Sequence, residues 1–176
     1  AGAFRLGSFT LKSGRQSPTF VNTGLVEDGH GLAELGEAYA ARALAACGPD
    51  GFDAVFGPAY KGVPLAVATA IALDRHGLRV PYLFDRKERK EHGEEAAGGD
   101  DAKALLVGHR PEAGERLLLV DDVLTTGATK FEAVQLLRRL VPDVRFPALV
   151  IAVDRQEADD AGDDAAGLFT AETGIP

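Results

Sequence analysis

Two adjacent carboxylates, Asp121 and Asp122, follow a run of four apolar residues at positions 117–120. The next segment, residues 125–129, holds three threonines, a glycine and an alanine, and a helical pattern begins there. A helix N-terminus offers unpaired backbone N–H groups and a partial positive charge, and Gly127 lets the backbone approach a ligand closely. The pattern therefore predicts a phosphate-binding turn. It differs from a P-loop, because the spacing G-x-x-x-x-G-K-[ST] is absent.

The two carboxylates need a task that is compatible with a neighbouring phosphate, because like charges repel unless something positive or neutral separates them. We expect Asp121 and Asp122 to face the hydroxyls of a sugar, or to hold Mg²⁺ directly or through water. A ribose that carries a phosphate at C5 and a pyrophosphate at C1 satisfies both requirements. The simpler alternative is a helix cap with a spare acidic residue. That alternative explains a bare Asp-Asp pair, but not the strand, the hydroxyls and the glycine in register.

Basic side chains gather in two other segments. Lys61 follows a Gly-Pro turn at positions 57–58 that ends a predicted strand, and a lysine at such a point can reach a pyrophosphate. Residues 84–95 include the basic side chains Arg86, Lys87, Lys90 and His92. The ordinary alternatives are an exposed lysine and a solvated charge run. A basic cluster in a chain of net charge -8, in a segment too long for an ordinary connection, favours a polyanionic ligand.

Several of these segments resemble one family. Residues 120–129, VDDVLTTGAT, resemble the 5-phosphoribosyl 1-diphosphate signature of type I phosphoribosyltransferases. Four further segments are similar to orotate phosphoribosyltransferases, in the expected order: FTLKSGRQSPTFVN at 9–22, FGPAYKGVPLA at 56–66, FDRKERKEHGEE at 84–95 and IAVDRQE at 151–157. The resemblance covers nearly the whole chain, and residues 98–114 match least well. The family often has two aromatic residues where this chain has Phe20 and Val21.

The resemblance implies a role for individual residues. Orotate, a flat anion, would be held by residues that supply charge, a stacking face and a hydroxyl: Lys12, Phe20, Val21, Thr125 and Arg155. The phosphoribosyl donor would contact a larger set: Lys12, Tyr60, Lys61, Arg86, Lys87, Lys90, His92, Asp121, Asp122, Val123, Leu124, Thr125, Thr126, Gly127, Ala128 and Thr129. The residues implied to be catalytic are Lys90, His92, Asp121 and Asp122.

The resemblance also implies a reaction, a cofactor and an assembly. The products would be orotidine 5′-phosphate and pyrophosphate, in the de novo synthesis of UMP. Mg²⁺ would be the cofactor, carried mainly by the donor and by water near Asp121 and Asp122, with no protein side chain assigned as its ligand. In the family the basic loop reaches into the site of the partner subunit, which implies a homodimer with shared active sites.

An α/β fold must position these residues. Apolar runs typical of strands occur at residues 52–56, 80–84, 117–120 and 146–153, and helical periods occur at 31–46, 63–75 and 130–140. Strands that alternate with helices predict a parallel sheet flanked by helices. Residues 4–22 add two short strands around a turn.

The fold that the resemblance implies is one phosphoribosyltransferase domain over residues 1–176, type I in its topology. Residues 1–30 and the C-terminal segment would form a small hood over the base site. Residues 85–104 combine a basic half with a half of Gly, Ala and acidic residues that has nothing to bury. This composition predicts a long mobile catalytic loop.

Composition limits the class of protein. A net charge of -8 argues against nucleic acid and anionic membrane surfaces as partners. No run approaches the ~20 apolar residues of a membrane span, no signal peptide is visible, and the single cysteine, Cys47, excludes an intramolecular disulfide. We therefore expect a cytoplasmic protein.

Two alternative functions stay open. A phosphoribosyltransferase for another base would leave Lys12 and Arg155 without a carboxylate to bind. A regulator that senses 5-phosphoribosyl 1-diphosphate and binds nucleic acid should carry a basic face.

Overall fold

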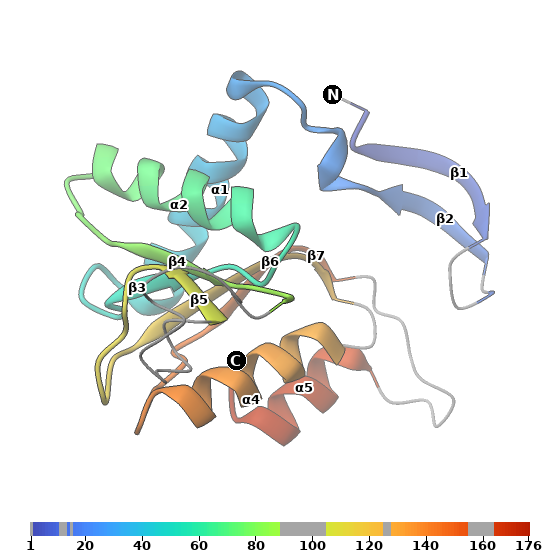
Figure 1. The fold of residues 1–176 in the computed structure, drawn as a ribbon. Coiled ribbons are helices and arrows are strands. Elements are labelled where there is room, and N and C mark those ends of the chain that lie inside the picture. Colours follow the sequence, from blue (N-terminus) through green and yellow to red (C-terminus); the bar gives the residue numbers. More distant parts are fainter. Residues whose placement is uncertain (1, 11–13, 15, 89–104, 125–127, 155–163) are drawn as a thin grey trace.

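A five-stranded sheet in the order β5-β4-β3-β6-β7 forms the centre of the molecule (Figure 1). The computed structural model describes residues 2–10, 14, 16–88, 105–124, 128–154 and 164–176. The strands are β3 (Ala54–Phe56), β4 (Tyr82–Asp85), β5 (Leu106–Gly108), β6 (Leu117–Leu124) and β7 (Leu149–Asp154). Strands β4, β3, β6 and β7 pair in parallel, and β5 pairs with β4 in the antiparallel sense. The predicted α/β fold with a mainly parallel sheet is confirmed.

Helices cover both faces of the sheet (Figure 1). Helices α1 (Gly29–Cys47) and α2 (Gly62–Arg75) lie on one face, and α4 (Ala128–Leu140) and α5 (Ala165–Thr173) lie on the other. Successive residues of β6 point to opposite faces, so Leu118 belongs to the core under α1 and α2 while Leu119 belongs to the core under α4 and α5. Burial on both faces explains why the strand is apolar without alternation.

Helices α1 and α2 approach each other closely at a glycine. A Cβ atom added to Gly36 would lie 2.4 Å from the carbonyl oxygen of Ala68, so any side chain there would push the helices apart. Helix α1 begins after Asp28, whose side chain accepts a hydrogen bond from the backbone N of Gly31 at 2.7 Å. One turn beyond Gly36, the buried Tyr39 reaches β6 and donates to the carbonyl oxygen of Asp121 at 2.7 Å.

The predicted N-terminal strands form an antiparallel hairpin, β1 (Phe4–Thr10) and β2 (Gln16–Val21). The hairpin stands apart from the main sheet, on the side where β6 and β7 end, and the short helix η1 (Thr23–Leu25) follows it (Figure 1). The rings of Phe9 in β1 and Phe20 in β2 pack together with their centroids 5.5 Å apart, and this contact helps to join the two strands. A role for the hairpin as a hood over a base stays a prediction.

Strand β6 is longer than the sequence indicated. It was expected to end at residue 120, before the two carboxylates, but it continues through Asp121 and Asp122 to Leu124. The extension is stable because Val123 and Leu124 still pair with β7, and because lysines neutralise the two buried acids. The carboxylates therefore project from a strand rather than from the turn after it.

Strand β5 and helix α5 were not expected from the sequence. Strand β5 is only three residues long, and α5 has no clear apolar period. Helix α5 packs through the buried Ala165 and Phe169 and is capped at both ends: Asp164 accepts a hydrogen bond from the backbone N of Gly167 at 2.6 Å, and Gly174 ends the helix with φ of 75°. No helix in the described part of the chain is both long enough and apolar enough to cross a membrane.

The segment predicted as a mobile loop is only partly described. Asp85, expected to be its first residue, is the last residue of β4, where it pairs with Leu106. Residues 89–104 lie outside the described residues, so the loop itself stays a prediction.

Candidate active site

A cavity of about 300 Å³ opens between the loop after β3 and the end of β6. The strand order reverses at this point, because the chain runs from β3 to β4 on one side and later from β6 to β7 on the other. Open α/β sheets bind ligands at the carboxyl ends of their strands at such switch points. The cavity is lined by Val21, Pro58, Ala59, Lys61, Asp121, Asp122, Val123, Thr129 and Lys130.

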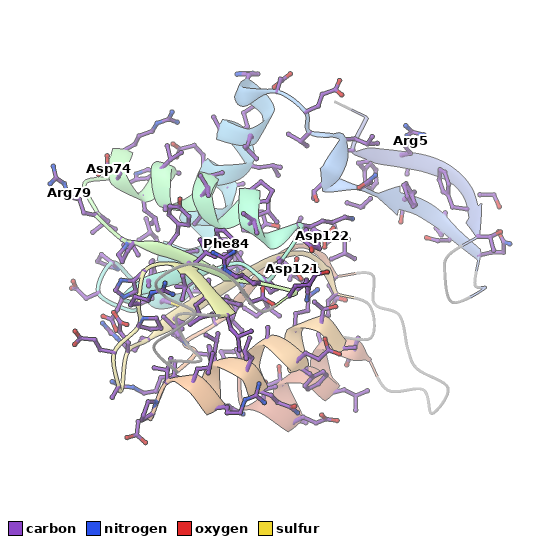
Figure 2. All side chains as sticks on the ribbon, in the orientation of Figure 1. Arg5, Asp74, Arg79, Phe84, Asp121 and Asp122 are labelled. Carbon is purple, nitrogen blue, oxygen red and sulfur yellow. The ribbon has the colours of Figure 1, made fainter. Side chains whose placement is uncertain are left out.

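Each carboxylate in the cavity wall has its own lysine. The Oδ2 atom of Asp121 lies 2.5 Å from Nζ of Lys130, and both side chains are more than nine-tenths buried. The Oδ2 atom of Asp122 accepts a hydrogen bond from Nζ of Lys61 at 2.9 Å, and the Lys61 side chain is 54% exposed. Figure 2 labels both carboxylates at the end of β6. One pair is therefore internal, while the other includes a cation in contact with water.

Backbone groups fix the orientation of both acids. The Oδ1 atom of Asp121 accepts from the backbone N of Asp122 at 2.9 Å, and Oδ1 of Asp122 accepts from the backbone N of Val123 at 2.7 Å. Lys130 donates a second hydrogen bond, at 2.8 Å, to the carbonyl oxygen of Val123. The hydroxyl of Thr23 lies 3.5 Å from Oδ2 of Asp122 and connects η1 to the site.

Tyr39 supports the acids from inside the protein. Burial, followed by the negative charges of Asp122 and Asp121, raises the pKa of its phenol above the ordinary value. The hydroxyl therefore stays protonated at neutral pH and keeps donating to the Asp121 carbonyl oxygen.

The loop between β3 and α2 is held in place on two sides. A Cβ added to Gly57 would lie 2.1 Å from the carbonyl oxygen of Gly62, so the two ends of the loop touch through their backbones. The backbone N of Ala59 donates to Oδ1 of the buried Asp85 at 2.6 Å. These contacts tie the loop to the end of β4 and set the point from which Lys61 extends toward Asp122.

A second hollow, of about 290 Å³, adjoins the first. It is lined by Ala59, Tyr60, Val63, Phe84, Asp85, Arg86, Lys87 and Glu88. Within the described residues, the buried Nε atom of Arg86 has no hydrogen-bond partner, and Nζ of Lys87 lies 3.7 Å from Oδ2 of Asp85. Because Ala59 lines both hollows, one extended anion can reach the cations of each.

The structure brings many of the predicted site residues together. The main cavity is lined by Val21, Lys61, Asp121, Asp122, Val123 and Thr129, and the second hollow by Tyr60, Arg86 and Lys87. Three predicted residues line neither hollow. Phe20 packs on Phe9, Leu124 is buried in the sheet, and Ala128 is exposed at the start of α4.

The other predicted site residues lie outside the described part of the chain: Lys12, Lys90, His92, Thr125, Thr126, Gly127 and Arg155. Their roles stay predictions.

Three residues that shape the site were not predicted from the sequence to belong to it. Lys130 was taken as the first residue of a helix, Asp85 as the start of a loop, and Tyr39 as part of an apolar period. The position of Lys130 in the first helical turn after two buried acids could have indicated its ion pair, because that turn lies against the end of the preceding strand. The chain offers no comparable signal for Tyr39, whose partner is a backbone atom distant in sequence.

The donor groups present suit a magnesium ion that arrives with its ligand. Within the described residues, no group of three or more His, Cys, Asp or Glu side chains is arranged to hold a metal ion. Asp121 and Asp122 line the cavity, so they can contact the water shell of an ion bound to a polyphosphate.

The chain is similar to proteins of known activity. The family model described as Phosphoribosyl transferase domain matches residues 23–168. The orotate phosphoribosyltransferase of Bifidobacterium adolescentis is 44% identical over 99% of this chain and 74% of its own length, and that of Pseudomonas putida is 45% identical over 99% and 76%. The crystal structure of orotate phosphoribosyltransferase from Francisella tularensis superposes with a TM-score of 0.80 at 33% identity, covering 99% of this chain and 77% of that one.

Proposed function

The chain belongs to the orotate phosphoribosyltransferase family, and from that premise we propose that it transfers a 5-phosphoribosyl group from 5-phosphoribosyl 1-diphosphate to orotate. The products are orotidine 5′-phosphate and pyrophosphate, and the reaction serves de novo pyrimidine synthesis. One observation carries the proposal: two carboxylates and two lysines line a cavity at the switch point of the sheet, directly before the N-terminus of α4.

The cavity provides a place for each part of the donor. The 5-phosphate binds at residues 125–129, a placement supported by Thr129 in the first turn of α4, which lines the cavity. The ribose hydroxyls bind Asp122 once Lys61 has moved away from that carboxylate. Lys61 then meets the pyrophosphate, and the exposed length of its side chain allows that movement.

The reaction is a displacement at C1 of the ribose. As the bond to pyrophosphate breaks, the sugar becomes positively charged and the leaving group gains negative charge. Fixed cations around the leaving group give the largest stabilisation, and Lys61, Arg86, Lys87 and Lys90 supply them. His92 donates a hydrogen bond or a proton to pyrophosphate. Magnesium would arrive bound to the donor and would supply further positive charge to the leaving group.

No protein nucleophile takes part in this mechanism. A ring nitrogen of orotate attacks C1 directly, while Asp121 and Asp122 offset the positive charge that develops on the sugar. Orotate is held by Lys12, Phe20, Val21, Thr125 and Arg155. Of these, Val21 lines the cavity, which supports a base site between the hairpin and the end of β6.

We further propose a homodimer in which residues 85–104 of one subunit serve the active site of the other. An exposed apolar hollow on α2 and β4 supports self-association, because it is lined by Val67, Ala70, Ile71, Asp74, Arg75 and Tyr82. Ile71 is 52% exposed and Tyr82 is 38% exposed, so both are available for contact with a second subunit. A cytoplasmic location fits a chain whose single cysteine leaves it without internal disulfides.

A direct assay tests the reaction. The absorbance of orotate should fall when 5-phosphoribosyl 1-diphosphate and Mg²⁺ are added to the purified protein, and pyrophosphate should appear in equal amount. Uracil and adenine serve as control acceptors. If either control reacts as fast as orotate, the assignment of the base is wrong. If no acceptor reacts and no donor binds, the proposed function as a whole is wrong.

A further inference from the structure

Lys130 occupies an unusual position for a lysine. It lies in the first turn of α4, yet its side chain points back to β6 and is only 8% exposed. Its Nζ atom lies 2.5 Å from Oδ2 of Asp121 and donates to the carbonyl oxygen of Val123 at 2.8 Å. A lysine with no task is rarely buried, because removing an ammonium group from water is unfavourable unless it is paired.

The contacts of Lys130 continue through the site as a chain. Lys130 holds Oδ2 of Asp121, and Oδ1 of the same carboxylate accepts from the backbone N of Asp122. Asp122 in turn accepts from the backbone N of Val123, whose carbonyl oxygen is bonded to Lys130. The four groups form a closed loop of contacts at the point where β6 leads into the phosphate-binding turn.

The second lysine of the cavity behaves differently. Lys61 also pairs with a carboxylate, but its side chain is 54% exposed and can exchange Asp122 for another anion at little cost. Lys130 and Asp121 cannot separate in this way, because each would leave an unpaired charge in the interior. The cavity therefore holds one permanent ion pair and one exchangeable ion pair.

We propose that Lys130 is a positioning residue for donor binding, acting through Asp121. By fixing the Asp121 carboxylate it orients the backbone of Asp122, so that the Asp122 carboxylate faces the cavity and meets the ribose hydroxyls when Lys61 leaves. This assignment rests on the proposed function, and it makes the two adjacent acids unequal. Asp121 supports the site and acts on the sugar only through its charge, and Asp122 is the acid that contacts the donor.

Double-variant kinetics test the proposal. The variants are Lys130→Met, Asp121→Asn and the combination of both, and the readouts are the melting temperature and the KM for each substrate. Lys130→Met should raise the donor KM by about tenfold or more, as expected for a charge-assisted contact, and change the orotate KM by less than about twofold. Because Lys130 acts through Asp121, the double variant should have the same donor KM as Asp121→Asn alone.

Lys61→Met is the matched control. This lysine meets the donor without passing through Asp121, so its effect on the donor KM should multiply with that of Asp121→Asn. If the effects of Lys130→Met and Asp121→Asn also multiply, Lys130 acts on the ligand directly and the proposal is wrong.

The double variant also decides the outcome if a single variant does not fold. It removes both buried charges, so it should melt close to the parent temperature while its donor KM stays raised. A folded double variant with the parental donor KM would overturn the proposal, because the role of the pair would then be structural only. Calorimetric binding of 5-phosphoribosyl 1-diphosphate with Mg²⁺ gives the same comparison without an acceptor, so a failure of the orotate assignment is distinguishable from a failure of this one.

Discussion

At the scale of single residues, Asp121 and Asp122 are neighbours in sequence but differ in environment. Adjacent residues of a strand point to opposite faces, and here each face supplies its own cation. The cation for Asp121 comes from α4 and is buried, while the cation for Asp122 comes from the loop after β3 and is exposed. A sequence motif of two acids therefore contains two different functional groups.

Replacement of each acid by asparagine should separate these functions. Asp122→Asn leaves the exposed Lys61 free to hydrate, so we expect an unchanged free energy of unfolding and a large loss of kcat/KM for the donor. Asp121→Asn leaves the buried Lys130 unpaired, so we expect destabilisation of about 3–5 kcal/mol together with lost activity. Urea unfolding and steady-state kinetics measure the two effects. Equal losses of stability in both variants would contradict the assignment.

A residue's role could be predicted from the sequence where the groups that it acts with are close to it in the chain. The turn after β6 and the acids before it were recognisable because their chemistry is local: apolar strand, acids, hydroxyls, glycine and helix follow one another. The pairing of Asp122 with Lys61 was not predicted, because the two residues are 61 positions apart. Asp85 was misjudged for a similar reason, since the group that it holds is the backbone N of Ala59, 26 positions earlier.

At the scale of elements, the fit between α1 and α2 determines where Tyr39 meets β6. Gly36→Ala places a methyl group against the backbone of Ala68, so we expect destabilisation of about 1–3 kcal/mol and reduced activity per folded molecule. Gly29→Ala, in the first turn of the same helix, is the control. An added Cβ there has no neighbour within 4 Å, so stability should change by no more than about 0.5 kcal/mol in urea unfolding. Equal effects of the two substitutions would refute the close-packing explanation.

The beginnings of β3 and β6 are joined by an ion pair that should depend on pH. Asp53 accepts from Nε of Arg116 at 3.0 Å, and Nη2 of the same arginine lies 2.6 Å from the other carboxylate oxygen. The hydrogen bond from the Arg116 side chain is the main cause that lowers the pKa of the Asp53 carboxyl. A lowered folded-state pKa adds stability above the unfolded-state pKa, near about 4, and this stability is lost as the pH falls through the folded-state value.

The comparison of Asp53→Asn with the parent tests this dependence. At neutral pH the variant should be less stable by no more than about 1 kcal/mol, because the pair is about one-third exposed. The difference should shrink as the pH falls below about 4, where the parent carboxyl takes up its proton. Asp74→Asn is the control, since Asp74 and Arg79 are 3.9 Å apart and mostly exposed. Thermal unfolding between neutral and acidic pH measures both, and a difference that does not change with pH would rule out the ion-pair explanation.

The elements that could be predicted are those with a strong repeating pattern. Helices α1, α2 and α4 were expected within two residues of their observed ends, because each presents a regular apolar face to the sheet. Strand β5 is short and pairs with β4, and helix α5 is short and lacks a polar face that would set off its buried one, so neither shows a clear period in the sequence. The end of β6 was misplaced because polar residues normally mark the end of a buried strand, and here lysines from other elements compensate them.

At the scale of the whole molecule, the balance of charges at the site differs from the net charge of the chain. The chain carries a net charge of -8, yet in the described lining of the two adjoining hollows the cations Lys61, Lys130, Arg86 and Lys87 equal the acids in number. A net negative charge discourages nucleic acids and other extended polyanions, while a site in which cations match the acids can still admit a small one. The basic segment that continues beyond residue 88 would add to this site, either in the same subunit or in a partner.

Subunit complementation distinguishes these two arrangements. Lys90→Ala and Asp122→Asn should each inactivate the enzyme, because one lacks a cation for the leaving group and the other lacks the acid for the ribose. If residues 85–104 serve the partner's site, a mixed dimer has one site with both defects and one site with neither. Random exchange gives about half mixed dimers with one sound site each, so roughly a quarter of the parental activity should return on mixing.

The control is a mixture of Lys61→Ala with Asp122→Asn. If Lys61 acts in the same subunit as the Asp122 that it contacts, each mixed dimer keeps one defect in each site and no activity returns. If the Lys90 mixture also stays inactive although subunit exchange is demonstrated, the loop serves its own subunit, and a protein that sediments as a monomer would remove the shared site altogether.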